Sequence, residues 1–252
     1  MIVLKSSHEL ALMREAGRIV AQTLAALSEQ VQPGVTTAQL DALAHRFITE
    51  HGAIPSFTGY RGFPASLCVS INREVVHGIP GPRVLREGDI VSLDVGAIHQ
   101  GYHGDAAITV GVGEISKEAT RLMEVTAGAL EAGIAETRPG RRLWDVIRAI
   151  QNYVESRGFN VVREYQGHGI GREMHEEPSI PNFLNSSGVR PRNILLRPGM
   201  TFALEPMVVA GDWRTRVQAD KWTVVTMDGK LSAHFEHTIA VTEAGPEVLT
   251  QL

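Results

Sequence analysis

Residues 86–110, REGDIVSLDVGAIHQGYHGDAAITV, decide the fold that we predict for this chain. Apolar runs before Asp94 and after Asp105 are typical of two β-strands, and the glycines between Gly96 and Gly104 predict the bend that joins them as an antiparallel pair. Two carboxylates placed side by side away from water repel each other unless a cation neutralises them. A bound metal ion is therefore the simplest explanation, although either aspartate alone would more often begin or end a turn.

The same pattern occurs again later in the chain, with both acids in register as Glu205 and Glu236. The aligned segments are REGDIVSLD (86–94) with RPGMTFALE (197–205), and HGDAAITV (103–110) with HFEHTIAV (234–241). A hydrophobic pattern can recur by chance, but an acid at the matching place in both strands of both copies is harder to dismiss. Four carboxylates around one pseudo-two-fold axis would form a cage for two divalent cations.

Helical patterns also occur twice. One run of apolar residues, preceded by Ser6 and Glu9 as a capping box, stops at Pro33-Gly34, and the next run begins at Thr36. In the second half the corresponding runs stop at Pro139-Gly140 and Gly158. The order helix, helix, strands therefore repeats, and we predict one catalytic domain, 1–252, with an internal duplication of about 7–112 and 113–249.

The composition of the 252 residues is ordinary for a soluble enzyme. Lysine and arginine number 24 against 28 acidic residues, so no basic excess indicates nucleic acid. The single cysteine, Cys68, excludes an internal disulfide and a cysteine-based zinc site. No signal peptide and no apolar run long enough for a membrane span is evident. We expect a cytoplasmic protein that does not contact a membrane.

Three histidines are candidate functional residues. His168 lies in GHGIG (167–171), where the glycines allow its ring to approach a neighbouring group, and a structural role is an equal alternative on this stretch alone. Beside four acids, it would be a fifth ligand. Such an oxygen-rich site with one imidazole suits Mn, Fe(II), Co or Zn. His175 and His77 are further candidates, although histidines of this kind are more often core or surface residues.

The candidate ligands and their surrounding motifs resemble those of a known family. The five candidate ligands and the motifs that contain them are Asp94 in SLDVG, Asp105 in YHGDAA, His168 in GHGIGREMHEEP, Glu205 in MTFALEPM and Glu236 in SAHFEHT. In this order they resemble the ligand set of the methionine aminopeptidases, and the match is closest to the short bacterial type I enzymes. The resemblance implies the α+β pita-bread fold. Its two αβ halves form a curved antiparallel sheet, with helices on the convex face and metals in the concave centre.

The resemblance also implies an activity, the metal-dependent removal of initiator methionine from nascent polypeptides whose second residue is small. Asp94 would chelate one ion, and Asp105 with Glu236 would bridge two. His168 and Glu205 would complete the second ion's ligands. Two such ions activate a water for attack on the first peptide bond.

Three residues would act on the substrate by the same resemblance. Glu205 would accept the proton of the attacking water and pass it to the leaving amine. His175 would donate a hydrogen bond to the developing oxyanion, and His77 would hold the scissile amide or the leaving nitrogen.

A methionine pocket is implied as well. The residues that match its lining are Tyr60, Phe63, Cys68, Met174 and Trp222; without the resemblance, core packing would be preferred for each. The chain differs from the bacterial pattern at Met174, Phe63, Phe57 and Arg61, and in a longer loop from Asn182 to Asn193. These differences concern the pocket's shape and its selectivity, and they leave the metal chemistry unchanged. The family further implies a monovalent cation near Asn72 and Ser232.

The nearest alternatives belong to the same fold, and two others are of different classes. Xaa-Pro aminopeptidases, Xaa-Pro dipeptidases and creatinase share the fold and ligands, but usually carry a preceding domain. A non-catalytic pita-bread binding module would lack part of the ligand set, which is complete here. A two-metal phosphoesterase would require basic residues beside the acids. Nascent N-termini are the expected partners, with the ribosome as a further candidate, and a monomer is expected.

Overall fold

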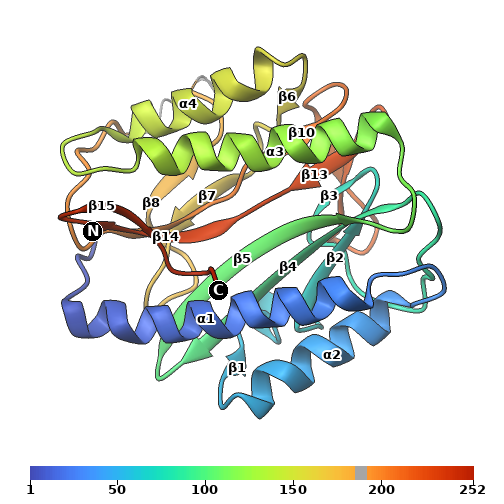
Figure 1. Ribbon diagram of the computed structural model, residues 1–252, viewed down its shortest axis with the longest axis horizontal. Coiled ribbons are helices and arrows are strands. Elements are labelled where there is room, and N and C mark those ends of the chain that lie inside the picture. The colour runs from blue at the N-terminus through green and yellow to red at the C-terminus, as the bar shows by residue number, and fades with distance from the viewer. Residues whose placement is uncertain (185–191) are drawn as a thin grey trace.

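The computed structural model describes residues 1–184 and 192–252, and its elements follow in two rounds of two helices and then strands (Figure 1). The helices are α1 (Ser7–Gln30), α2 (Thr37–Glu50), α3 (Lys117–Glu136) and α4 (Leu143–Glu155), with a 3-10 turn η1 (Tyr60–Gly62). The strands of the first round are β1 (Ile54–Pro55), β2 (Leu67–Ile71), β3 (Glu74–Val76), β4 (Ile90–His99) and β5 (Tyr102–Gly111). The later strands are β6 (Asn160–Val161), β7 (Gln166–Gly169), β8 (Glu176–Pro181), β9 (Thr201–Leu204), β10 (Met207–Val209), β11 (Thr215–Val217), β12 (Val224–Thr226), β13 (Ser232–His234), β14 (His237–Thr242) and β15 (Gly245–Val248).

The predicted start of α1 is confirmed in detail. The Ser6 hydroxyl accepts a hydrogen bond from the backbone N–H of Glu9 at 3.3 Å, and the Glu9 carboxylate accepts one from the N–H of Ser6 at 2.9 Å. This reciprocal cap satisfies two N–H groups that the first helical turn leaves free. Thr36 and Gln39 cap α2 in the same way.

The hairpin of β4 and β5 is longer than predicted. The expected bend between Gly96 and Gly104 is wrong, because the strands continue to His99 and Tyr102 and are joined only by Gln100 and Gly101. Both turn residues have positive φ, 47° and 80°, as a two-residue hairpin of matching twist requires. The sequence was misleading because Gly104 serves close packing: a Cβ there would lie 2.8 Å from the backbone nitrogen of Gly17 in α1.

Every strand pair between described residues is antiparallel. A four-stranded sheet contains β4 and β5, and a five-stranded sheet contains β9 and β14. These two sheets meet where Glu236 donates its backbone N–H to the carbonyl of Ala107 at 2.8 Å. Strands of the two rounds thus lie against each other along β5 and β14 (Figure 1).

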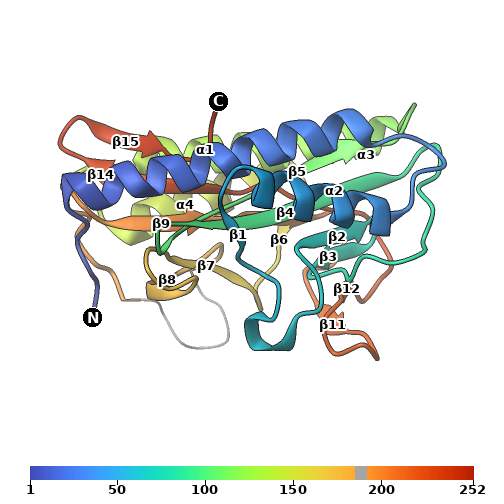
Figure 2. The same cartoon turned by 90° about the horizontal axis from the view of Figure 1, so that it is seen from below.

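The long helices α1 and α3 run along one side of β4 and β9, and strands β8 and β11 lie on the opposite side (Figure 2). One buried apolar cluster combines α1 and α2 with strands of the first round, and another combines α3 and α4 with strands of the second. The mixed content, antiparallel pairing and one-sided helices agree with the predicted α+β class. No helix in the described part of the chain is both long and apolar enough to cross a membrane.

Candidate active site and metal centre

The four predicted acids come from four different strand positions and gather around the junction of the two sheets. In the register of the hairpin, Asp94 opposes Ala107 and Asp105 opposes Gly96, a diagonal relation that places both side chains on one face. Glu205 directly follows β9, and Glu236 directly precedes β14. The second pair of acids therefore lies at strand ends, whereas the first pair lies within strands.

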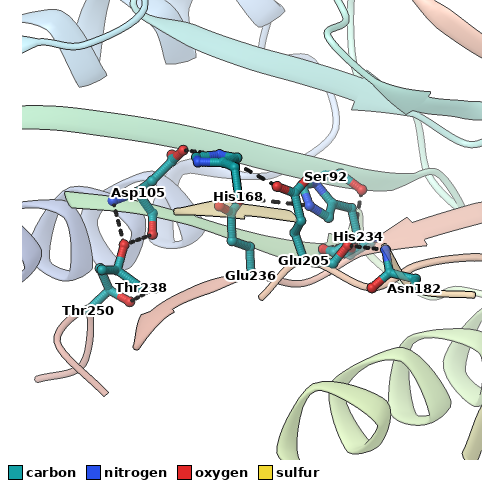
Figure 3. Close-up of polar contacts among 10 residues, drawn as sticks. Ser92, Asp105, His168, Asn182, Glu205, His234, Glu236, Thr238 and Thr250 are labelled. Atoms are coloured by element: carbon teal, nitrogen blue, oxygen red, sulfur yellow. Dashed lines mark hydrogen bonds and ion pairs between the residues drawn. The ribbon is translucent and has the colours of Figure 1, made fainter. Parts of the chain in front are cut away.

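His168 joins these acids from β7. Its Nε2 lies 3.8 Å from Asp105 Oδ2 and 3.6 Å from Glu205 Oε1 (Figure 3). Its Nδ1 lies 2.9 Å from the carbonyl oxygen of Gly169, which can only accept, so Nδ1 carries the proton and Nε2 offers a lone pair to the acids. The flanking glycines are needed because a Cβ on Gly167 would lie 2.4 Å from the backbone oxygen of Ala203.

Burial makes this group of acids costly to ionise. It raises the pKa of Asp94 to about 7 from an ordinary 3.8. Burial first, and then the neighbouring carboxylates, raise the pKa of Asp105 and of Glu236 well above their usual range. Burial followed by the charge of Asp94 does the same to the pKa of Glu205. A divalent cation would remove this cost by neutralising the carboxylates.

The donor atoms fit such a cation. Asp94 Oδ1, Asp105 Oδ1 and Glu236 Oε1 are buried without a hydrogen-bond partner among the described residues. Ligand atoms of Asp105, His168 and Glu236 lie within 4.8 Å of one another. Buried carboxylate oxygens and an imidazole nitrogen, gathered and unpaired, are the donor set of a divalent transition-metal site.

His234 is a member of this group that the sequence analysis missed. One of its ligand atoms and those of Asp94 and Glu236 also lie within 4.8 Å of one another, and burial lowers the pKa of its imidazole to about 3. A signal was present in the aligned repeats, because His234 stands two residues before Glu236 as His103 does before Asp105. Residues two apart on extended chain project to the same face.

His175 and His77 lie next to the acids, as predicted. The ring centres of His175 and His168 lie 4.0 Å apart, and the Nδ1 of His175 is 2.8 Å from the hydroxyl oxygen of Tyr60. His77 has a positive φ of 60° and packs edge-on against Trp222. Burial lowers the pKa of His77 to about 4, and burial with the charge of His168 lowers that of His175 to about 3. Both imidazoles are therefore neutral near pH 7.

The four acids, His77, His168 and His175 line a cavity of about 240 Å³. All five predicted methionine-pocket residues line this cavity: Tyr60, Phe63, Cys68, Met174 and Trp222. Phe63 packs edge-on against Trp222 with 5.1 Å between ring centres, and burial raises the pKa of the Cys68 thiol. The result is a slot of aromatic rings and polarisable sulfur beside the acids, a surface to which a thioether is suited.

The structure also shows where the remaining residues named in the sequence analysis lie. Phe57 and Arg61 also line the cavity, as do five residues that the sequence analysis did not select: Val76, Glu164, Tyr165, Gln166 and Met207. Of the predicted loop from Asn182 to Asn193, positions 185–191 lie outside the described residues. Asn72 and Ser232, the predicted monovalent cation site, are joined by a backbone hydrogen bond of 2.8 Å.

Comparison with known proteins agrees with this geometry. Residues 11–243 match the model of metallopeptidase family M24, and the chain belongs to this family. A methionine aminopeptidase 1 from Bacillus subtilis (strain 168) is 54% identical over 252 residues, which cover 100% of both chains. A methionine aminopeptidase from Clostridium perfringens (strain 13 / Type A) is 52% identical over 250 residues, 99% of both chains.

A solved structure gives the same result for the fold. The methionine aminopeptidase of Thermotoga maritima superposes with a TM-score of 0.96 at 48% identity, covering 100% of both chains. The predicted pita-bread fold and the predicted resemblance are thereby confirmed.

Proposed function

We propose that this chain is a methionyl aminopeptidase, a metal-dependent hydrolase that removes the initiator methionine from nascent polypeptides when the second residue is small. The observation that carries this proposal is the position of the apolar, sulfur-containing cavity directly beside the buried acids. A side chain bound in that cavity would place its own peptide bond next to the buried carboxylates that line it. Relatives named methionine aminopeptidase that match the whole chain also favour it over an Xaa-Pro peptidase.

Five residues would hold two divalent ions, which we take to be Co, Mn, Fe(II) or Zn. They are Asp94, Asp105, His168, Glu205 and Glu236. Asp105 and Glu236 are the most deeply buried of these carboxylates, with 3% and 2% of the residue surface exposed, and each would contribute carboxylate oxygens to the ions. When bound, such ions act as Lewis acids and provide an activated water for attack on a peptide carbonyl.

Glu205 would move the proton. It is half-buried and lines the cavity, so one carboxylate oxygen can face an attacking water while the other faces His168. The burial that raises its pKa makes it a stronger base than an exposed glutamate.

The two neutral histidines would act as hydrogen-bond donors to the substrate. The Tyr60 hydroxyl and the Nδ1 of His175 share one hydrogen bond, which orients the imidazole beside His168, where the carbonyl oxygen would become negative. Trp222 holds His77 edge-on, where its ring can reach the scissile amide or leaving nitrogen.

The proposal extends to the enzyme's location, partners, bound monovalent cation and domain organisation. We infer that it acts in the cytoplasm as a monomer on nascent chains, near the ribosome, and binds neither nucleic acid nor membrane. We further infer a monovalent cation near Asn72 and Ser232, and one catalytic domain built from duplicated halves of about 7–112 and 113–249.

The test is methionine release from Met-Ala-Ser by the chelated protein, to which Co, Mn, Fe(II) or Zn is restored in turn. Release is expected with at least one metal and is expected to be lost in Glu205→Gln, which removes the proton acceptor. Glu243→Gln, an exposed change of the same type after β14, is the matched control and should retain full activity.

Two parallel substrates distinguish the alternatives. Met-Phe-Ser should release much less methionine than Met-Ala-Ser if the second position must be small. Cleavage of Ala-Pro-Ser instead of Met-Ala-Ser would assign the chain to the Xaa-Pro peptidases. No release with any metal would favour the binding-module alternative.

A further inference from the structure

His234 is placed firmly but its ring is unpaired. The residue ends β13, where it opposes Met207 of β10. The Thr109 hydroxyl accepts a hydrogen bond from the His234 backbone N–H at 2.9 Å and donates one to the His234 carbonyl at 2.8 Å. Ser92 in turn contacts the Thr109 hydroxyl at 2.8 Å. The N–H and the carbonyl of His234 are thus both hydrogen-bonded, which limits the directions in which the imidazole can point.

The imidazole points toward the acids. Its Nε2 lies 3.7 Å from Glu236 Oε2, which is too long for a direct hydrogen bond. Only 1% of the residue is exposed, and neither ring nitrogen has a hydrogen-bond partner among the described residues. A buried polar ring without partners is costly unless another group occupies the space beside it. Figure 3 shows this ring close to the ligand cluster.

We propose that His234 supplies an imidazole nitrogen to the divalent ion held by Asp94, as a sixth protein ligand of the metal centre. Ligand atoms of Asp94, His234 and Glu236 lie within 4.8 Å of one another, a spacing that one ion can span. The second group, Asp105, His168 and Glu236, has the same composition of two carboxylates and one imidazole. Each ion would then have one histidine, with Glu236 shared. This inference rests on the proposed metal centre.

The His234 ring lies outside the lining of the cavity that would hold the substrate. His234 is not among the residues that line the cavity, whereas Asp94 and Glu236 are. The ring therefore approaches the carboxylates from within the protein. His103, the residue at the equivalent place in the first repeat, has a different environment: its Nδ1 contacts the Ser56 hydroxyl at 2.9 Å. The repeat thus provides a matched buried histidine whose ring is already hydrogen-bonded.

The experiment uses cadmium as the probe. The full chain, labelled with ¹⁵N-histidine and loaded with two equivalents of ¹¹³Cd(II), is examined by ¹¹³Cd NMR. Two resonances are expected, each split by one histidine nitrogen. In His234→Gln one resonance should lose its splitting, and the dissociation constant of that ion should rise at least tenfold. His103→Gln should keep both splittings.

The wild-type spectrum can already overturn the proposal, so a variant that fails to fold does not prevent the test. A single resonance, or two of which only one is split, would overturn the proposal. So would a His234→Gln spectrum with both splittings retained. Methionine release from Met-Ala-Ser is measured on a manganese-loaded sample of the same preparation. Absence of release would reject the proposed function, while the cadmium couplings would still decide the role of His234.

Discussion

Replacing Thr238 with valine would test whether the junction of the two sheets positions the metal centre. The fully buried hydroxyl of Thr238 accepts a hydrogen bond from the backbone N–H of Asp105 at 3.0 Å and donates one to the Asp105 carbonyl at 2.8 Å (Figure 3). Valine has nearly the same shape, so packing is kept while both hydrogen bonds are lost. The Asp105 N–H would then be buried without this partner.

An unsatisfied buried donor costs about 1–3 kcal/mol, so we expect the free energy of unfolding to fall by roughly 2 kcal/mol. For a chain of this size, 1 kcal/mol corresponds to roughly 2–4 °C in Tm, so the melting temperature should fall by about 4–8 °C. Thermal unfolding of the chelated protein, followed by circular dichroism, measures this change without a contribution from metal binding.

Thr242→Val is the matched control for this prediction, since it makes the same substitution on the same strand. The Thr242 hydroxyl donates to the carbonyl of Gly245 at 2.8 Å in a half-buried turn. Water can replace that partner, so Tm should fall by no more than about 2 °C. Equal shifts in the two variants would refute the argument. A displaced Asp105 should also weaken Mn(II) binding about 10- to 100-fold in Thr238→Val alone, as measured by isothermal titration.

Three further predictions follow from the same site. In the chelated protein, burial raises the folded-state pKa of Asp94 to about 7 from an unfolded-state 3.8. The contribution of this group to the free energy of unfolding is therefore complete below pH 3.8 and is lost as the pH rises through 7. Tm of the chelated protein should fall over this window, and a metal-loaded sample that shows the same fall would contradict the reasoning. Burial raises the pKa of Cys68, so iodoacetamide at pH 8 should modify the single thiol slowly until denaturant exposes it; fast modification of the folded chain would be the contrary result. Met174→Ala removes part of the cavity wall and about 2 kcal/mol of apolar contact with the substrate side chain. The kcat/KM for Met-Ala-Ser should therefore fall roughly 10- to 30-fold, and an unchanged value would show that Met174 does not contact the substrate.

Much of the centre could be predicted because its signals are local. The capping boxes, the hairpin and its two acids depend on neighbours in the sequence and on strand periodicity, and the internal repeat indicated the other two acids, Glu205 and Glu236. The resemblance then supplied roles for His77 and His175, which no local pattern distinguishes from ordinary core histidines. The structure places the four acids, His77 and His175 in the lining of one cavity.

What could not be predicted depends on contacts between distant segments. The glycine at 104 indicated a bend because a sequence cannot show that helix α1 passes against that point. His234 was passed over because its burial and its missing partners arise from strands more than a hundred residues apart, through Thr109. The offset of Glu205 and Glu236 to strand ends likewise follows from how β9 and β14 pair.

The two threonine contacts explain why a centre shared by two halves can be rigid. Thr238 in the second half holds the backbone of Asp105 in the first, and Thr109 in the first half holds the backbone of His234 in the second. Neither half can shift along the junction without moving a residue that would hold the metal ions. Ions that bind only the joined arrangement stabilise it, by about 2.7 kcal/mol for a single site at a hundredfold excess over the dissociation constant. Loss of either threonine hydroxyl should therefore cost more stability in the metal-loaded protein than in the chelated one, because the ions and the junction hold the same backbone.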